Sequence, residues 1–515
     1  FCPFGPPFVY EMGGGFYPKD PPAFSLLAAP LYAALGWRGL YLLPLVSLWV
    51  VWWRADAVCR GLRLSPAAHA LTLAALVFGT PLLFYSATFW GHLPAVAVAF
   101  AGLSLLLVRP VCPASREGPE DSEAPLGSRG IPGPGPPAPL AGAASRPTPG
   151  TSGPARLAGH AQEAGRGVVR TAAAGLLIGA SVWLRSDLLA LPATLVLMLG
   201  SARFRGWVGR PGLFAAAMIL PVLGLLAFNQ AAVGYPLGVH AFQAVDTTPG
   251  ERVISAAWAF GWNARTLAIT CPSVVVAAFG CLLLWRNPGL RGRLPRGLWV
   301  AAVTGLAFAA VVAAILPTRD LFGTGGKQFG PRFLLPTILL LTLLTGPLYE
   351  LAGRAPALRS LRLYLPAGLV CAVVVNTPYA WWHLRADYAG RIRPGLEAVR
   401  ARPEPVVAVP TQFVAQDLEA LIPQKHVLWV RDAVRLEELV ERCAQKGYGA
   451  VLFVRDAEDF HFPHPELLGV PPGFADRWTD LGRFGSLRLA SVETSPPRTA
   501  IPRAAASAAP VRRTP

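Results

Sequence analysis

About ten apolar segments of roughly membrane-spanning length constrain the fold of this chain more than any other feature. They are expected near residues 38–53, 66–83, 92–108, 168–184, 188–202, 211–232, 262–285, 297–317, 332–352 and 362–382. A helix that crosses the hydrocarbon core of a bilayer needs about 20 residues, so re-entrant pieces are also compatible with the shorter segments, chiefly around 184–202. The pattern predicts a mainly α, polytopic transmembrane helical bundle.

The connections between these segments alternate in charge. Arginines fill four short connections: Arg54, Arg60 and Arg63; Arg203, Arg205 and Arg210; Arg286, Arg291, Arg293 and Arg296; and Arg354, Arg359 and Arg362. Short loops rich in arginine stay on the cytoplasmic side of a membrane. We therefore expect 54–65, 110–166, 203–210, 286–297 and 353–362 in the cytoplasm, and the chain start and residues 393–492 outside.

Composition supports a membrane protein. The chain is 53% hydrophobic and only 15% charged, whereas a soluble globular protein has roughly 25% charged residues. A net charge of +17 would suggest nucleic acid in a soluble protein, but here the arginines lie in short loops. We therefore expect the lipid bilayer as a partner and no nucleic acid. The seven cysteines form no CxxC pair, which argues against a disulfide framework or a zinc site, and no cofactor is expected.

Composition shifts divide the chain into parts. Residues 393–492 hold three short apolar stretches at 406–409, 427–430 and 450–454, with helical patterns at 416–421 and 435–445 between them. That order predicts a small α/β domain with a partly parallel sheet. The expected parts are 1–108, an external loop and the first membrane helices; 109–167, a disordered Pro/Gly-rich cytoplasmic linker; 168–384, the remaining membrane helices; 393–492, the extracytoplasmic α/β domain; and 493–515, a disordered tail.

A proline-locked turn precedes a short apolar stretch near the start, in FYPKDPPAFSLLAAPLY (residues 16–32). Flanking prolines hold Lys19 and Asp20 in a stiff, extended turn. The stretch Phe24–Leu35, which Gly36 ends, is helix-compatible but too short to cross a bilayer. We expect it at the membrane surface, where a cation can meet an anionic lipid headgroup. The alternative is an ordinary loop before a helix, and this stretch alone does not separate the two.

The pattern YPK-x-PP-x-x-x-L-L-x-x-P-L-Y resembles the first large external loop of GT-C membrane glycosyltransferases. That class includes the lipid A aminoarabinose transferases and bacterial enzymes similar to protein mannosyltransferases. The resemblance covers roughly residues 8–380. It implies inverting sugar transfer from a polyprenyl-phosphate-sugar donor to an acceptor at the external face of a bacterial cytoplasmic membrane. The sugar is not specified, and the acceptor is an unidentified glycan, lipid or protein.

The resemblance also implies a role for Lys19, which matches the lysine that contacts the donor phosphate in aminoarabinose transferases. Asp20 departs from the family pattern, which has an aromatic residue or none at that point. A pair between Asp20 and Lys19 would weaken the phosphate contact. The alternative is a surface ion pair worth about 0–1 kcal/mol.

A second cationic segment is TRDLFGTGGKQFGPRF, residues 318–333. Its glycines free the backbone for close approach to a ligand. Lys327 and Arg332 supply cations, and the guanidinium of arginine matches a phosphate with two parallel hydrogen bonds. GxxFGPR before a late membrane helix also resembles GT-C enzymes, which favours donor-phosphate binding. The alternative is a flexible loop whose cations extend to the membrane interface.

Further candidates lie in outward connections. His92 ends the aromatic turn YSATFWGH, where it contacts substrate or has a structural role. Arg185 and Asp187 lie between two apolar runs, as a buried structural pair or as the lining of a sugar cavity. The external loop 233–261 is a candidate for acceptor contacts, with His240, Asp246, Glu251 and Arg252. His461 and His464 form an HxxH without a third ligand, so no metal is expected.

The catalytic carboxylate, which would deprotonate the acceptor, is expected upstream of Phe1. The family places this acid in the first external loop, just after a first membrane helix. We therefore expect the sequence to be an N-terminally truncated member, with Glu11 or Asp20 as the base if it is not.

A transporter or flippase of a lipid-linked sugar is the alternative function. An enzyme would gather Lys19, Arg332 and a carboxylate at one external cavity, whereas a transporter would bring ionisable groups to the membrane midplane.

Overall fold

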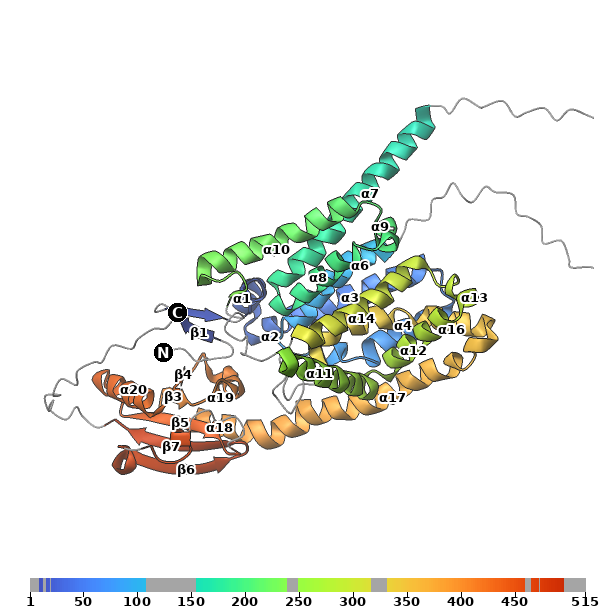
Figure 1. The fold of residues 1–515 in the computed structure, drawn as a ribbon. Helices are drawn as coiled ribbons and strands as arrows, with labels where there is room; N and C mark the ends of the chain where they lie inside the picture. The colour runs from blue at the N-terminus through green and yellow to red at the C-terminus, as the bar shows by residue number, and fades with distance from the viewer. Residues whose placement is uncertain are drawn as a thin grey trace, which may run out of the picture.

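The computed structural model describes residues 9–12, 15–18, 20–107, 154–238, 249–315, 331–458, 465–471 and 473–494. It is mainly helical, with a small mixed sheet near the C-terminal end, as the sequence predicts (Figure 1). Several predicted residues lie outside the described parts of the chain: Lys19, His240, Asp246, Lys327, His461 and His464.

The N-terminal half of the bundle is built from α1 (Ala23–Leu35), α2 (Trp37–Leu40), α3 (Leu42–Gly61), α4 (Pro66–Phe78), α5 (Leu82–Ser86), α6 (His92–Leu107), α7 (Pro154–Ala180), η2 (Ser181–Trp183), η3 (Ser186–Leu189) and α8 (Ala190–Met198). The other half is built from α9 (Ala202–Val208), α10 (Pro211–Val233), α11 (Pro249–Thr270), α12 (Pro272–Arg286), α13 (Pro288–Arg291), α14 (Arg296–Ile315), η5 (Arg332–Leu334), α15 (Leu335–Thr342), α16 (Thr345–Arg354), η6 (Pro356–Leu358) and α17 (Leu361–Trp381).

Five helices in the described chain are long and apolar enough to cross a membrane, or six if one bent pair is counted as a span. The five are Trp37–Gly61, Pro211–Val233, Arg296–Ala314, Arg332–Arg354 and Pro356–Trp381. The predicted segments 66–83, 92–108 and 188–202 contain shorter apolar helices, namely Pro66–Phe78, His92–Leu107 and Ser186–Met198. These are shorter than the roughly 20 residues of a full crossing. The chain therefore has fewer full-length spans in its described parts than the ten segments expected.

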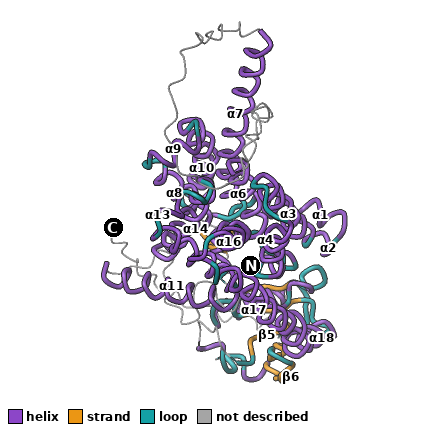
Figure 2. Tube along the Cα trace, turned by 90° about the vertical axis from the view of Figure 1, so that its right-hand side faces the viewer, coloured by secondary structure: helices purple, strands orange, loops and turns teal. Residues whose placement is uncertain are grey.

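Two boundaries differ from the prediction for local reasons. The segment 262–285 is not one straight span, because α11 and α12 meet at an angle of 113°. Pro272 begins α12 and has no backbone N–H to continue the preceding helix. In addition, α7 begins at Pro154, inside the predicted linker 109–167, and extends away from the bundle (Figures 1 and 2). Most of residues 155–163 are strong helix formers (Ala, Arg, Leu, Gln and Glu), which outweighs the single Gly159 among them.

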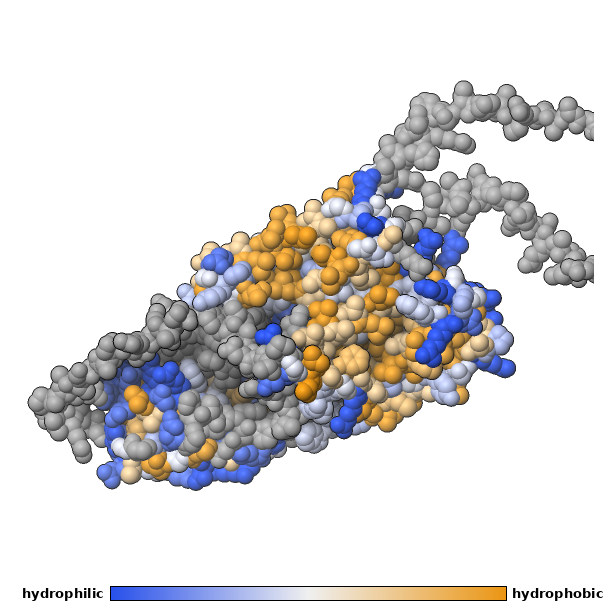
Figure 3. Space-filling view, viewed as in Figure 1, coloured by the Kyte–Doolittle hydropathy of each residue, from blue (hydrophilic) through white to orange (hydrophobic). Residues whose placement is uncertain are grey.

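Small residues bring the helices of the bundle close together. A Cβ on Gly175 would lie 2.5 Å from the carbonyl oxygen of Phe214, and one on Gly179 would overlap that of Met218. Glycine at both positions lets α7 approach α10 backbone to backbone, as in many membrane helix pairs. Large apolar side chains on the outer faces of α10 and α17 remain exposed, among them Leu220, Leu223, Leu363 and Val374 (Figure 3). Lipid tails would cover such faces in a bilayer.

The described parts of the predicted cytoplasmic connections lie at one end of the bundle. The carboxylate of Glu350 accepts a hydrogen bond from the backbone N–H of Ser65, which joins α16 to the loop before α4. A Cβ on Gly297 would lie 3.1 Å from Nε1 of Trp207 and 3.3 Å from Cδ2 of Leu107. Hydrophilic residues cover this end, at the right of Figure 3. The arrangement agrees with the alternation of charge in the sequence.

The C-terminal sheet contains β3 (Val406–Val409), β4 (His426–Trp429), β5 (Ala450–Asp456), β6 (Trp478–Phe484) and β7 (Leu487–Glu493), in the order β4-β3-β5-β7-β6. The first three strands are parallel, and β7 and β6 pair antiparallel beyond them. Val407 and Val409 face α18 (Arg393–Ala401) and α19 (Gln412–Asp417), while Val406 and Ala408 face α20 (Ala433–Gln445). The partly parallel core was predicted from the sequence, but β6 and β7 were not.

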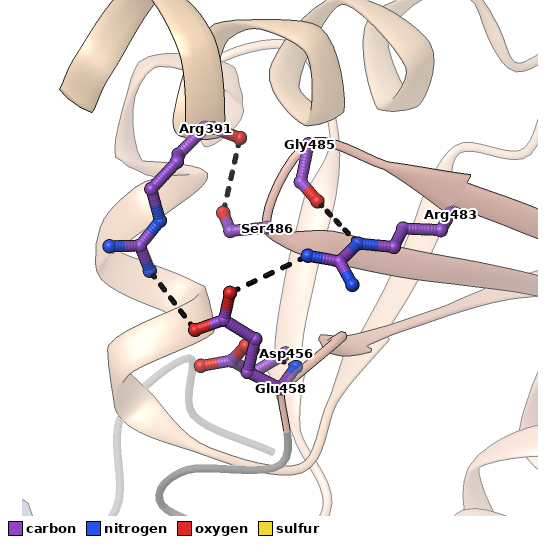
Figure 4. A network of polar contacts seen from close by, with 6 residues as sticks. All are labelled: Arg391, Asp456, Glu458, Arg483, Gly485 and Ser486. Carbon is purple, nitrogen blue, oxygen red and sulfur yellow. Dashed lines mark hydrogen bonds and ion pairs between the residues drawn. The ribbon is translucent and has the colours of Figure 1, made fainter. Parts of the chain in front are cut away.

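A polar network joins this sheet to the last membrane helix (Figure 4). The helix α17 continues through a π-helix, η7 (Trp382–Ile392), directly into α18. At its end the carbonyl oxygen of Arg391 accepts hydrogen bonds from the backbone N–H (2.8 Å) and the hydroxyl (3.2 Å) of Ser486. The carboxylate of Glu458 lies 3.8 Å from the guanidinium of Arg391 and 3.5 Å from that of Arg483. The β6–β7 turn is thus fixed to the point where the chain leaves the bundle.

Gly485→Ala is expected to destabilise this junction more than Gly447→Ala. Both glycines have positive φ, +61° and +78°, so alanine costs about 1–2 kcal/mol at either site. A Cβ on Gly485 would also overlap the carbonyl oxygen of Arg391, whereas one on Gly447 meets nothing within 4 Å. Thermal unfolding of the purified variants should show the larger fall for Gly485→Ala. Equal falls would mean that the turn does not hold the junction.

Candidate functional site

Side chains from four distant segments meet at one end of the bundle. Asp20 lies between a hairpin, β1 (Val9–Met12) with β2 (Gly15–Pro18), and α1. His92 begins α6, Arg185 and Asp187 lie at η2–η3, and Arg332 begins η5. The other end of α6, Leu107, lies with the arginine-rich connections, about 24 Å away for a 16-residue helix. The cluster therefore lies at the end opposite the predicted cytoplasmic loops.

Arg185 is at the centre of this cluster. Its Nη1 donates to Oδ2 of Asp20 over 2.9 Å, and its Nε donates to Oδ1 of Asp187 over 2.9 Å. The side chain of Arg185 is only 11% exposed. Hydrogen bonds in which both groups are charged are stronger than neutral ones, and a buried charge requires them. One guanidinium thus holds two carboxylates in fixed positions.

Asp187 also faces a histidine. Its Oδ2 lies 3.8 Å from Nε2 of His92, whose side chain is 3% exposed. Burial raises the pKa of Asp187, but the nearby Arg185 and His92 outweigh burial and hold that pKa below its usual range. Asp187 is therefore a carboxylate at neutral pH. It is suited to holding Arg185 in place rather than to accepting a proton.

Two aromatic rings contact Arg332, the second arginine of the cluster. The guanidinium carbon of Arg332 lies 4.9 Å from the ring centre of Trp90 and 4.6 Å from that of Phe333. Trp90 in turn stacks on His92, with ring centres 5.3 Å apart. Cation–π contacts of this kind are worth about 0.5–2 kcal/mol, depending on exposure. The rings connect Arg332 to the ion-pair cluster through His92.

Gly91 allows the aromatic turn to approach Arg185 closely. A Cβ at this position would lie 3.2 Å from Cδ of Arg185, 3.2 Å from the carbonyl oxygen of Leu184 and 3.3 Å from Cγ of Phe24. A larger residue would push the turn away from the cluster. The sequence gives no direct signal for this packing role, although a glycine directly before His92 is visible in YSATFWGH.

The structure brings together Asp20, His92, Arg185, Asp187 and Arg332 of the predicted site residues. A pair between Asp20 and Lys19 was one possibility, which stays untested because Lys19 is outside the described chain; the structure joins Asp20 to Arg185. Glu11 lies in β1, opposite Phe16 of β2. Glu251 and Arg252 were expected in an external loop, but they lie in the first turn of α11. The contacts of Trp90 and Phe333 with Arg332 were not predicted.

The cluster brings the carboxylates of Asp20 and Asp187 together with the guanidinium groups of Arg185 and Arg332. Such a group can hold a phosphate on its cations and accept a proton on a carboxylate. No group of three or more potential metal ligands occurs among the described residues.

The chain is similar to known proteins in its structure. No family model matches the sequence, and no curated protein matches it. The crystal structure of ArnT from Cupriavidus metallidurans in the apo state matches 94% of this chain and 89% of its own, with a TM-score of 0.50 and 12% identity. The structure of ArnT from the same organism bound to undecaprenyl phosphate matches 94% and 90%, with a TM-score of 0.52 and 11% identity.

Identity this low shows similarity of fold and not of activity. The match extends over both the bundle and the C-terminal part, since it covers 94% of the chain. This chain has the polytopic helical fold of ArnT.

Proposed function

We propose that this protein is a membrane glycosyltransferase that moves a sugar from a polyprenyl-phosphate donor to an acceptor at the external face of a bacterial inner membrane. The observation that carries the proposal is the group Asp20–Arg185–Asp187 around a buried arginine, with Arg332 beside it, at the end of the bundle opposite the arginine-rich loops. The GT-C fold supports it, because ArnT of the same fold was crystallised with undecaprenyl phosphate bound.

Arg332 would bind the donor phosphate. Its guanidinium lies against the rings of Trp90 and Phe333, which hold this planar donor group in one orientation beside the cluster. Lys19 and Lys327 would add cations, as the resemblance to GT-C enzymes implies. Together they would stabilise the negative charge that develops on the departing phosphate.

Asp20 would act as the base among the described residues. Arg185 holds its Oδ2, whereas its Oδ1 is buried and has no hydrogen-bond partner in the described chain. An acceptor hydroxyl would give its proton to Oδ1 while its oxygen attacks the anomeric carbon of the sugar. The bond from that carbon to the phosphate oxygen breaks, its electrons leave with the phosphate, and the configuration inverts. Arg185 and Asp187 would position Asp20 without contacting the substrate.

The position of the charges favours an enzyme over a transporter. A transporter would bring ionisable groups to the midplane of the membrane. Among the described residues of the bundle, the buried arginine and histidine are Arg185 and His92, and both lie at the end of the helices. The location of Arg185 with Arg332 and a carboxylate matches the arrangement expected for transfer at the external face.

Transfer from a labelled polyprenyl-phosphate sugar by purified protein in a lipid extract tests the proposal. Arg332→Ala should lower kcat/KM for the donor about 10- to 100-fold, because a hydrogen bond to a charged group contributes about 1.5–3 kcal/mol. Arg385→Ala is the matched control, since Arg385 also lies over a ring, 4.5 Å from that of Trp381, outside the cluster. No transfer by the wild type with any such donor, or equal activity of both variants, would contradict the proposal.

A further inference from the structure

The helix α11 lies almost at right angles to α12, the helix that follows it. The chain turns by 113° between them, at Pro272. Figure 2, which looks along the bundle from the side of the arginine-rich connections, shows α11 lengthwise, at the lower left. A helix in this orientation lies along the surface of a membrane instead of crossing it.

The depth of α11 in the membrane follows from its two neighbours. The 15 residues of α12 end at Arg286, in an arginine-rich connection, so Pro272 lies about 22 Å from that end. The amide of Asn376 in α17 donates to the carbonyl oxygen of Thr270 over 2.8 Å. Within two further turns α17 reaches the exposed Trp381, and exposed tryptophans are typical of the boundary between lipid tails and headgroups. The hydrocarbon core is about 30 Å thick, so α11 lies near its external boundary.

One face of α11 packs on the bundle, and the other is exposed. Ala259 and Asn263, one turn apart, are 0% and 4% exposed, and α11 contacts α14 and α17. The exposed face carries large apolar side chains, namely Val253, Ile254, Trp258, Phe260 and Ile269. Because the outer face of α17 is also apolar and exposed, the lipid tails that cover α17 would cover this face of α11 as well.

A single charge lies on this exposed face. Arg265 is the sole charged residue between Val253 and Thr270. Its guanidinium carbon lies 5.3 Å from the ring centre of Trp262, and that ring stacks on Trp258 with centres 5.5 Å apart and an angle of 9°. Arg265 forms no ion pair with any residue that the structure describes. A cation beside lipid tails is costly, so its charge requires an anion at the membrane surface.

The two edges of the exposed face differ in polarity. At about 100° per residue, Trp258 and Arg265 lie along one edge, and Val253 and Phe260 lie along the other. The first edge suits the headgroup region, where an indole N–H and a guanidinium find hydrogen-bond acceptors. The second edge suits the lipid tails. The pattern is that of an interfacial helix whose tryptophan and arginine edge faces the headgroups.

We propose that the edge formed by Trp258, Trp262 and Arg265 binds the headgroup of an anionic phospholipid in the outer leaflet. The guanidinium donates two parallel hydrogen bonds to the phosphate, and its stacking on Trp262 holds it in one orientation. The lipid tails lie along Val253 and Phe260. A headgroup that also carries an ammonium group would bring a second cation next to Arg265, so charge complementarity favours a lipid such as phosphatidylglycerol. This inference does not depend on the donor or acceptor of the proposed transfer.

Photolabelling of the purified full chain in lipid nanodiscs tests this inference. The discs contain phosphatidylcholine and a small fraction of phosphatidylglycerol whose headgroup carries a diazirine, and labelled peptides are mapped by mass spectrometry. The wild type should be labelled in the peptide that contains Trp258 and Arg265. Arg265→Gln should lower this label about fivefold, the effect of one arginine near an anionic surface, and leave the label on α17 unchanged. Arg265 is exposed, so this variant should fold normally.

Arg477→Gln is the matched control. Arg477 also lies over a ring, 5.0 Å from that of Phe474, but in the C-terminal domain, just before β6. This variant should be labelled on α11 as the wild type is. Unlabelled phosphatidylglycerol should displace the probe from α11 more than the same amount of undecaprenyl phosphate does.

Three outcomes would overturn the proposal. The first is equal labelling of α11 in the wild type and in Arg265→Gln. The second is stronger displacement of the probe by undecaprenyl phosphate, which would assign this edge to the donor. The third is crosslinking of α11 to a second copy of the chain, which would make the exposed face a contact between proteins.

Discussion

Arg185→Ala is expected to abolish transfer and to destabilise the protein by about 3–5 kcal/mol, the cost of breaking a buried ion pair by removing one partner. The loss would leave Asp20 and Asp187 close together with no shared cation, since Arg185 bonds to both at 2.9 Å. Arg185→Lys should recover only part of the stability, because an ammonium cannot reproduce the forked geometry that bridges two carboxylates.

Thermal unfolding in detergent and the transfer assay together check this expectation. Arg359→Ala is the matched control, since Arg359 is an exposed arginine after η6, in a predicted cytoplasmic connection. It should unfold at the wild-type temperature and retain activity. If Arg185→Ala behaved like this control, Arg185 would not hold the cluster together.

Asp20→Asn is expected to lower kcat about 10²- to 10⁴-fold, the usual contribution of a general base, with little change in KM for the donor. The amide oxygen of asparagine can still accept the hydrogen bond from Arg185, so the variant should fold normally. The amide has no capacity to take the proton of the acceptor hydroxyl at neutral pH. The loss should therefore appear in turnover and not in stability.

Asp56→Asn is the control for this experiment. Asp56 also contacts an arginine and a histidine, Arg60 and His69, but it lies in α3 near the arginine-rich end of the bundle. Its loss should leave kcat unchanged. Normal turnover by Asp20→Asn would show that another carboxylate takes the proton.

The sequence correctly predicted those helices and strands whose bounds depend on residues close to them in the chain. The apolar helix expected at Phe24–Leu35 is α1, Ala23–Leu35, and it ends at Gly36, whose φ is +63°. The strand expected at 406–409 is β3 with the same bounds. In these cases prolines, glycines and apolar runs act within a few residues of one another, so the sequence pattern is sufficient.

Contacts between distant parts of the chain could not be predicted in the same way. Asp20 and Arg185 are 165 residues apart, and nothing in either segment specifies the other. From the sequence, the partner considered for Asp20 was its neighbour Lys19. The cation–π contact of Arg332 with Trp90 likewise depends on how η5 packs against the turn before α6. The sequence identified the candidate residues, but only the packing of the bundle shows which of them meet.

Photocrosslinking tests the central claim most directly, namely that the buried cluster lies at the donor site. A photoreactive polyprenyl-phosphate sugar would be irradiated with the purified protein, and the labelled peptides mapped by mass spectrometry. The account predicts labels in peptides that contain Asp20, Trp90, Arg185 or Arg332, and their reduction by excess undecaprenyl phosphate. Labels confined to the arginine-rich connections 54–65 or 286–297, at the opposite end of the bundle, would contradict it.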